Sequence, residues 1–301
     1  MFIKFRNHHI ALYNDEDYNT AFSEMLAYGL NQSSTILYDV SIFNKFSRTM
    51  HKYSEKLPET TLQIGPGDSL GCEALLCLSG IKKAWSLDPS TCPKFDFIKF
   101  IATLQKLYEV LNSFLTINNC SAAPLSIPEH SIEAAGSYRI GKSVMQHFPN
   151  STFENTGLQN ESVDFLFSNA VLEHVRDPLQ CIREAHRILT KKGLTAHQID
   201  LRDHRDFSKP LQFLQYSDSQ WQKIMKKYCS RDPLGYMNRL RARDFLTIFE
   251  SAGFRILEFT PNSSVSDTVL NDAISCLDSS LNNYSRDELK ITSCFIVAEK
   301  R

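Results

Sequence analysis

The stretch LQIGPGDSLG at residues 62–71 decides the fold that this sequence predicts. Apolar residues at 61–64 predict a short strand before it, and the apolar run 70–78 predicts a helix after it. A second apolar run, 84–87, ends at an acidic residue and a proline. Residues 61–88 therefore predict a β–loop–α–β unit with a right-handed crossover and parallel strands.

The glycines of this loop and the acid that follows suggest a ligand. Gly65 and Gly67 lie between the expected strand and helix, where a residue without a side chain lets a ligand approach the backbone. Asp88 ends the second strand, where a carboxylate can accept hydrogen bonds from ribose hydroxyls. The glycines alone are weak evidence for a ligand, because a tight turn between a strand and a helix needs glycine in any case. Together with Asp88 they predict a site for a nucleoside cofactor.

The rest of the chain continues an alternation of strands and helices. Further strands are expected at 144–148, 163–167, 194–199, 254–259 and 291–299, the last two as an antiparallel pair. Helices are expected at 17–29, 40–56, 94–115, 179–189, 220–228 and 243–252. Lys191, Lys192 and Gly193 are expected to close the 179–189 helix, since cations and a left-handed glycine suit a helix C-terminus. Residues 118–142 are polar and receive no strand pairing.

This pattern predicts an α/β protein with a Rossmann-like, seven-stranded, mostly parallel sheet and helices on both faces. Four segments are expected along the chain. They are an N-terminal helical extension or cap at 1–57, the cofactor-binding domain at 58–200, a lid-like insertion at 201–247, and a C-terminal helix with the antiparallel strand pair at 248–301.

Composition excludes several classes of protein. Of the 301 residues, 42% are hydrophobic and 22% charged, as in ordinary folded proteins. A net charge of −1 supplies no general attraction for nucleic acid or an anionic membrane. The apolar run 74–81 is too short to span a bilayer, and no signal peptide is recognised. The eight cysteines form no metal-binding pair. We expect a cytoplasmic protein with no membrane span and no nucleic-acid partner.

A second motif, VDFLFSNAVLEHVRD at residues 163–177, precedes the segment RILTKKG at 187–193. With the glycine loop, these segments resemble the class I methyltransferases that depend on S-adenosyl-L-methionine (SAM), in the type 11-like branch with an LEH segment. The resemblance covers about residues 60–200, and both segments occur in the order and spacing of that family. A nicotinamide-dependent dehydrogenase shares the glycine loop but has no reason to carry the second motif.

The resemblance implies that SAM is the cofactor and assigns residues to it. Gly65, Pro66 and Gly67 would pass beneath its methionine and ribose. Asp88 would hold the ribose hydroxyls, and Pro89 would lie near the adenine.

The same resemblance extends to the third and fourth strands. Leu158 would border the adenine, while Ser168 and Asn169 would face the sulfonium. The sequence departs from the family at two positions. The usual acid two residues before the first glycine is Gln63, which accepts a hydrogen bond without a full charge. The usual third glycine is Ser69.

Two interpretations exist for Glu173 and His174. In the first, Glu173 favours the N-terminus of the next helix and His174 packs against the loop. In the second, the pair resembles part of the E-x-x-E-H segment that ligates a metal in small-RNA 2′-O-methyltransferases. The first glutamate of that segment is Ala170 here. We therefore predict no metal.

A third motif, AHQIDLRDH at residues 196–204, leaves the fifth strand at the edge where open α/β sheets bind ligands. His197 or His204 is a candidate base for the acceptor's proton, with Asp200 orienting it. Because side chains alternate along a strand, His197 and Asp200 are expected on opposite faces. The alternative is that these groups cap the following loop.

A basic stretch follows in the expected insertion, interleaved with Trp221, Tyr228 and Tyr236. Its cations are Lys223, Lys226, Lys227, Arg231, Arg239, Arg241 and Arg243. One interpretation is a solvated face; the other is a site for an anionic substrate, since arginine binds phosphate and carboxylate well.

These features together predict a SAM-dependent methyltransferase that acts on a small or carrier-linked metabolite. O-methylation of a sugar or saccharide is favoured, because a polar acceptor suits the histidine and aspartate at the sheet edge. The alternatives are an RNA or protein methyltransferase that uses the 221–243 stretch, and a non-catalytic module that binds SAM.

Overall fold

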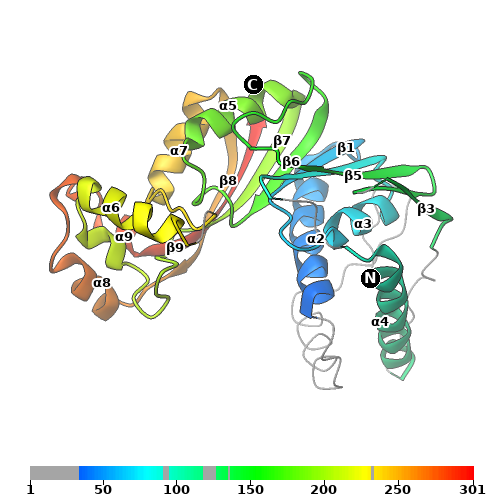
Figure 1. Ribbon diagram of the computed structural model, residues 1–301, viewed down its shortest axis with the longest axis horizontal. Coiled ribbons are helices and arrows are strands. Elements are labelled where there is room, and N and C mark those ends of the chain that lie inside the picture. Colours follow the sequence, from blue (N-terminus) through cyan, green and yellow to red (C-terminus); the bar gives the residue numbers. More distant parts are fainter. Residues whose placement is uncertain (1–33, 91–94, 118–126, 135, 232–233) are drawn as a thin grey trace. The chain divides into compact units, whose positions relative to one another are not determined.

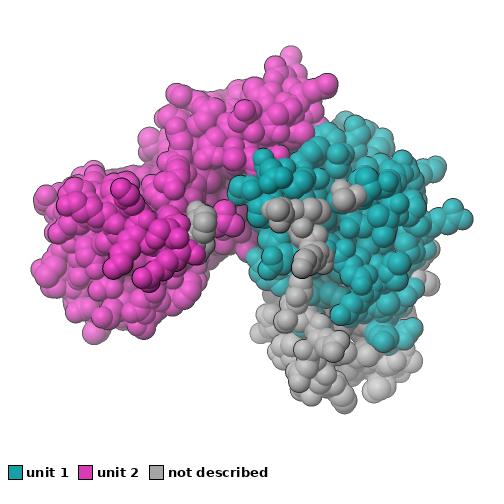
Figure 2. Space-filling view, in the orientation of Figure 1, with its two compact units in different colours: residues 1–150 teal, residues 151–301 magenta. Residues whose placement is uncertain are grey.

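The structure is a computed structural model that describes residues 34–90, 95–117, 127–134, 136–231 and 234–301. The chain divides into two compact units, residues 1–150 and 151–301 (Figure 2). The helix expected at 17–29 lies outside the described residues. Within the described part, no helix is both long and apolar enough to cross a membrane.

The sheet of the first unit has the strand order β3-β4-β5-β2-β1. The strands are β1 (Thr60–Ile64), β2 (Lys83–Asp88), β3 (His130–Ala134), β4 (Ser137–Ile140) and β5 (Ser143–Pro149). Strands β1, β2 and β5 are parallel, which confirms the predicted β–loop–α–β unit. Strands β3 and β4 form an antiparallel pair within the stretch that received no pairing. The residues of β3 are all exposed, so no buried face marked this strand in the sequence.

Three helices accompany this sheet (Figure 1). They are α2 (Ser34–Tyr53), α3 (Gly71–Leu78) and α4 (Phe97–Ile117). A methyl group on Gly71 would lie 2.1 Å from Asp39 Oδ2 on α2 and 2.6 Å from Phe100 Cε2 on α4. Both neighbouring helices therefore pack against the start of α3, and the close approach requires glycine. Helix α2 is thus part of the packed first unit.

The sheet of the second unit has the order β6-β7-β9-β8. The strands are β6 (Val163–Asn169), β7 (Leu189–Asp200), β8 (Phe254–Ser264) and β9 (Ile291–Lys300), and the helices beside them are α5 (Pro178–Ile188) and α7 (Ala242–Ser251). Strands β6 and β7 are parallel, and the expected pair β8 and β9 is antiparallel. The α/β class is confirmed. The described residues hold nine strands in place of the predicted seven, with parallel and antiparallel pairs in each unit.

The expected end of the helix at residues 191–193 needs correction. Helix α5 ends at Ile188, and Leu189 already begins β7. Lys192, with φ of 61°, adopts the left-handed conformation that was assigned to Gly193. A methyl group on Gly193 would lie 2.7 Å from the carbonyl oxygen of Thr190. The glycine therefore permits a close backbone approach where β7 shifts its register against β6.

The other described helices of the second unit form a separate layer at one end of this unit (Figure 1). It consists of η1 (Gln212–Gln215), α6 (Asp218–Cys229), α8 (Asp267–Ile274), η2 (Ser279–Leu281) and α9 (Arg286–Lys290). Its buried core is Leu211, Phe213, Leu214, Trp221, Met225, Met237, Leu270, Ala273 and Leu289. The insertion at 201–247 therefore shares one hydrophobic core with the later excursion between β8 and β9.

The arginines of the basic stretch hold this layer together. Arg241 is fully buried, and its guanidinium donates to the carbonyl oxygens of Leu201, Leu289 and Ile291. Arg239 donates to the carbonyl oxygens of Phe213 and Tyr216 and forms an ion pair with Asp218, while Arg243 pairs with Glu288. The lysines at 223, 226 and 227 are exposed. These arginines thus serve mainly as ties between segments.

We expect Arg241→Ala to lower the free energy of unfolding by about 2–4 kcal/mol, because it leaves buried carbonyl groups without a donor. Urea denaturation measures this loss. Arg231→Ala is the matched control, since Arg231 is exposed on the same stretch, and its effect should stay within about 0.5 kcal/mol. Equal effects of the two substitutions would contradict the structural role of Arg241.

A second prediction concerns Glu73, which is fully buried in α3, where burial raises its pKa from 4.5 to about 8. Between these values the folded protein keeps a proton that the unfolded chain has released, so this group makes stability fall as pH rises. In Glu73→Gln that contribution disappears. Denaturation at pH values across the interval should show a flatter profile for Glu73→Gln, whereas Glu59→Gln, at an exposed position, should follow the unsubstituted protein.

Candidate functional site

The glycine loop between β1 and α3 has the backbone conformation that only glycine adopts easily. Gly65 has φ of 66° and Gly67 has φ of 71°, both in the left-handed region. The Gly65 N–H donates to the carbonyl oxygen of Leu87 at 2.9 Å, which ties the loop to β2. A methyl group on Gly67 would meet no atom within 4 Å. The loop therefore leaves open space beside its second glycine, as a bound ligand requires.

Polar groups at the ends of β1 and β2 suit a nucleoside cofactor with an ammonium group. Gln63 is buried, and its Oε1 has no hydrogen-bond partner among the described residues. Asp88 is also buried, with Oδ1 accepting from the Ser90 N–H at 2.8 Å. Pro66 is buried in the loop and Pro89 is exposed after β2. An orphaned acceptor at Gln63 and a fixed carboxylate at Asp88 fit the donors of SAM, its ammonium and its ribose hydroxyls.

Ser69, at the position of the usual third glycine, has a structural role in this unit. Its hydroxyl donates to Asp39 Oδ2 at 2.7 Å and accepts from the Gly71 N–H at 3.1 Å. Burial raises the pKa of Asp39 to about 6, and the hydrogen bond from Ser69 opposes that rise. Ser69 therefore fastens the loop to α2, a contact that the sequence did not suggest.

His197 lies in the core of the second unit, which corrects its assignment as a catalytic base. The residue is fully buried, with Nδ1 at 2.7 Å from Ser168 Oγ and Nε2 at 2.6 Å from Thr195 Oγ1. Its ring stacks on Phe153. Burial lowers the pKa of His197 to about 3. Both ring nitrogens are engaged and the ring stays neutral, so it is a packed core histidine.

The other residues assigned to the cofactor by resemblance lie in the second unit. Ser168 is fully buried against His197, while Asn169 is half-buried at the end of β6. Leu158 is half-buried in a loop where its N–H donates to Thr156 Oγ1 at 3.2 Å. Their contact with SAM stays a prediction.

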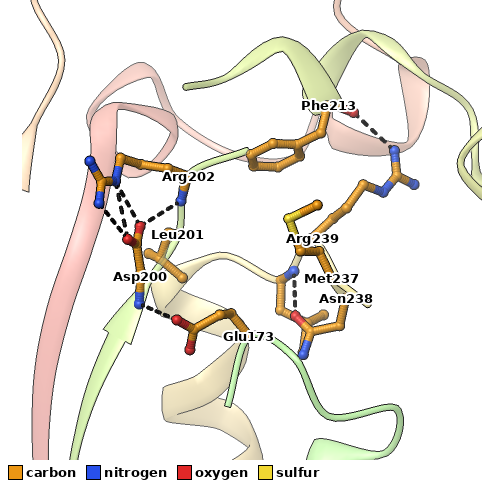
Figure 3. Close-up of a pocket in the computed structure, with 9 residues that line it drawn as sticks. Glu173, Asp200, Leu201, Arg202, Phe213, Met237, Asn238 and Arg239 are labelled. Carbon is orange, nitrogen blue, oxygen red and sulfur yellow. Dashed lines mark hydrogen bonds and ion pairs between the residues drawn. The ribbon is translucent and has the colours of Figure 1, made fainter. Parts of the chain in front are cut away.

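A pocket in the second unit lies where β6 and β7 end (Figure 3). It is lined by Glu173, Asp200, Leu201, Arg202, Phe213, Met237, Asn238, Arg239 and Leu240. Arg202 donates two hydrogen bonds to the Asp200 carboxylate. Its Nε lies 2.9 Å from Oδ1 and its Nη2 lies 2.6 Å from Oδ2. Burial alone would raise the pKa of Asp200, but the neighbouring His204 ring and the hydrogen bonds from Arg202 outweigh it and hold the pKa well below its ordinary value. Asp200 is therefore a fixed negative charge at this pocket.

His204 belongs to the same group of side chains. Its Nε2 lies 3.4 Å from Asp200 Oδ2, and its ring meets that of His174 with centroids 4.9 Å apart. Of the three predicted catalytic residues, the structure thus brings Asp200 and His204 together. His197 points away from them, as the alternation along the strand predicted.

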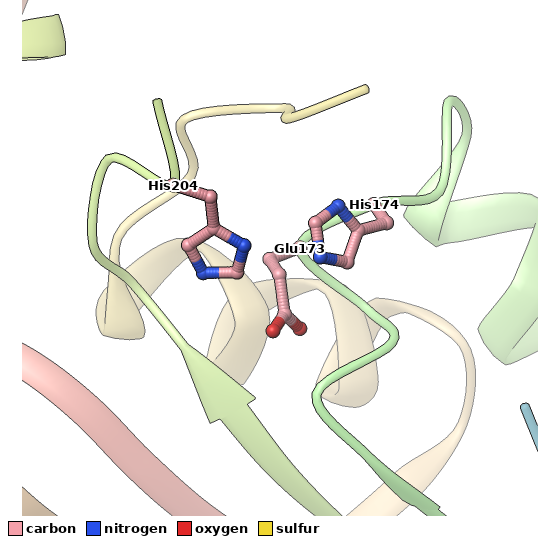
Figure 4. A group of neighbouring side chains, drawn as sticks. All are labelled: Glu173, His174 and His204. Carbon is pink, nitrogen blue, oxygen red and sulfur yellow. The ribbon is translucent and has the colours of Figure 1, made fainter. Parts of the chain in front are cut away.

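Glu173 and His174 lie beside His204 (Figure 4). Glu173 is 5% exposed, and its Oε1 accepts from the Asp200 N–H at 3.2 Å. Burial raises its pKa to about 8, with the Asp200 charge adding to the rise. His174 Nδ1 donates to the Tyr236 carbonyl oxygen at 2.7 Å, and Asn238 N–H donates to the Glu173 carbonyl oxygen at 2.9 Å. Sequence reasoning did not connect Tyr236 and Asn238 with this turn, which they hold from a distant segment.

A parallel strand–glycine loop–helix–strand unit with an acid after its second strand is the arrangement of Rossmann-like proteins that bind a nucleoside cofactor. Residues 115–196 also match the family model described as a methyltransferase domain. This match agrees with the predicted resemblance to the class I SAM-dependent methyltransferases and supports a methyltransferase that uses SAM. The match covers the second motif and does not extend to the glycine loop.

No curated protein matches the sequence. Among solved structures, a putative methyltransferase from Bacillus halodurans is 14% identical, with 84% of this chain and 97% of that chain covered and a TM-score of 0.42. A putative sarcosine dimethylglycine methyltransferase from Galdieria sulphuraria is 14% identical, with 89% and 87% covered and a TM-score of 0.45. Phosphoethanolamine N-methyltransferase 2 from Haemonchus contortus, solved with S-adenosyl-L-methionine, is 14% identical, with 85% and 52% covered and a TM-score of 0.44. TM-scores below 0.5 support no inference about the substrate.

We expect SAM and S-adenosylhomocysteine to raise the melting temperature of the protein, because a ligand that binds only the folded state stabilises it. Thermal denaturation with and without each compound measures the shift.

Asp88→Ala should weaken SAM binding by about 1–3 kcal/mol through the loss of charged hydrogen bonds. Calorimetric titration measures the change. Asp68→Ala, at an exposed position in the same loop, is the control. If a folded Asp88→Ala protein bound SAM as well as the control does, the assignment of Asp88 to the cofactor would be wrong.

Proposed function

We propose that the protein transfers the methyl group of SAM to a hydroxyl oxygen of a small or carrier-linked metabolite, with a sugar or saccharide favoured. The observation that carries this proposal is the polar pocket of the second unit. Asp200 and Arg202 line it, and His204 contacts Asp200 beside it. Fixed polar groups of this kind suit an acceptor rich in hydroxyl groups.

SAM supplies a methyl group on a positively charged sulfur, so the protein has to position the acceptor and receive its proton. His204 is our candidate for the base that receives this proton. The ionised carboxylate of Asp200 lies 3.4 Å from its Nε2, where it can orient the ring and stabilise the charge that the ring acquires. Arg202 keeps the carboxylate in place through its two hydrogen bonds.

The positions of the arginines weaken the proposal of an anionic or nucleic-acid substrate. Arg239, Arg241 and Arg243 are engaged by protein carbonyl groups and carboxylates. An exposed row of lysines remains on α6, at 223, 226 and 227. Binding through this row would weaken steeply with salt, because it depends on the release of counterions.

Labelled SAM and fractionated metabolites identify the acceptor. The protein is incubated with SAM that carries an isotopic methyl group, and Asp88→Ala serves as the control for cofactor dependence. We expect the label on the oxygen of a hydroxylated small molecule, located by mass spectrometry and NMR. Label on RNA, on protein, or on nitrogen or carbon would contradict the proposal.

We expect His204→Ala to lower turnover by about 10²–10⁴-fold on the identified acceptor while SAM affinity stays unchanged, because the change removes the group that acts on the acceptor's proton. Single-turnover kinetics and calorimetry separate the two quantities. His130→Ala, at an exposed histidine of the first unit, should alter neither. Unchanged turnover in His204→Ala would remove this residue from the chemistry.

A further inference from the structure

We propose that Glu173, His174 and His204 bind a divalent cation of the first transition series. One ligand atom from each residue lies within 4.8 Å of the other two (Figure 4). This inference goes beyond the proposed function, since binding of the cation needs neither SAM nor an acceptor.

The three side chains meet because of the sheet. Glu173 and His174 occupy the turn after β6, and His204 follows β7, the parallel neighbour of β6. Parallel strands place the loops at their carboxyl ends along one edge. Ligand atoms around a cation with bonds of about 2.0–2.2 Å lie roughly 3–3.5 Å apart. Side-chain rotations that move these atoms by about 1 Å therefore complete the set.

An independent observation at Glu173 also points to a ligand. The residue is 95% buried, and its Oε2 has no hydrogen-bond partner within the described part of the chain. Its other oxygen accepts a hydrogen bond from the Asp200 N–H at 3.2 Å. An unpaired polar atom in the interior is unfavourable and rare. A cation among the three residues gives this oxygen a partner.

Both imidazole rings are held as metal-binding histidines usually are. His174 Nδ1 donates to the Tyr236 carbonyl oxygen at 2.7 Å, which fixes the tautomer that carries a lone pair on Nε2. A carboxylate lies beside the second ring, with Asp200 Oδ2 at 3.4 Å from His204 Nε2. Carbonyl and carboxylate groups in these positions orient metal-binding rings and raise their basicity.

The ligand set indicates the kind of cation. Two imidazole nitrogens and one carboxylate oxygen suit Zn²⁺, Mn²⁺ or Fe²⁺ and leave coordination positions open. The expectation of no metal considered only the segment that contains Ala170, whereas His204 comes from the end of another strand. With the cation present, His204 is a ligand. With a cation bound there, the ring would not accept a proton, and the cation would supply the activation of the acceptor in its place.

The test uses the full chain after treatment with a chelator, titrated with Mn²⁺ or Zn²⁺ alone by calorimetry. We expect one site per chain. His174→Ala, His204→Ala and Glu173→Gln should each weaken binding at least about tenfold through the loss of a ligand. His130→Ala and Glu250→Gln are matched controls at exposed positions and should bind as the unsubstituted protein does.

A measurement on the unsubstituted protein guards against variants that fail to fold. Pulsed EPR of bound Mn²⁺ should show coupling to imidazole nitrogen. The proposal is overturned if Mn²⁺ and Zn²⁺ both bind more weakly than about 1 mM, if imidazole coupling is missing, or if folded variants bind normally. Since no assay here contains SAM or an acceptor, failure to find a methylated product leaves the result unaffected.

Discussion

Parallel pairing of neighbouring strands is the constraint on which the candidate sites depend. In the first unit, pairing of β1 with β2 brings the glycine loop and Asp88 to one edge. In the second unit, pairing of β6 with β7 brings the turn at Glu173 to Asp200, at the end of β7, and to His204 in the loop that follows. Residues that are distant in the sequence become neighbours because the two parallel strands of each pair end at the same edge of the sheet.

The buried polar side chains of the second unit differ in whether all of their polar atoms have hydrogen-bond partners. His197 has partners for both ring nitrogens, and its neutral ring belongs to the core. Glu173 has a partner for one oxygen only, although it is almost as deeply buried. A satisfied polar group stabilises one packing arrangement, whereas an unsatisfied one at a pocket indicates a position for a ligand. This difference separates His197, which was predicted as a base, from Glu173, which was predicted to favour a helix N-terminus.

The helical layer contributes part of the pocket wall, because Phe213 and Met237 belong both to its core and to the pocket lining. Arg241 binds carbonyl groups of two separate segments, at Leu201 and at Leu289 and Ile291, and Trp221 donates to the Met237 carbonyl oxygen at 2.9 Å. These contacts hold the segment 237–240, which lines the pocket and contains Asn238. Positive charge that suggested an anionic substrate thus contributes to the shape of the site, because buried arginines bind several carbonyl oxygens at once.

The sequence by itself determined the features that depend on local pattern. The glycine loop, the parallel pair around it, Asp88 and the final antiparallel pair followed from apolar runs and turn residues. The exposed strand at 130–134 has no buried face and could not be found in this way. Alternation placed His197 and Asp200 on opposite faces, but only tertiary packing decided which face is core. Tertiary structure alone joined Glu173, His174 and His204, because their proximity depends on the pairing of two strands and not on spacing along the chain.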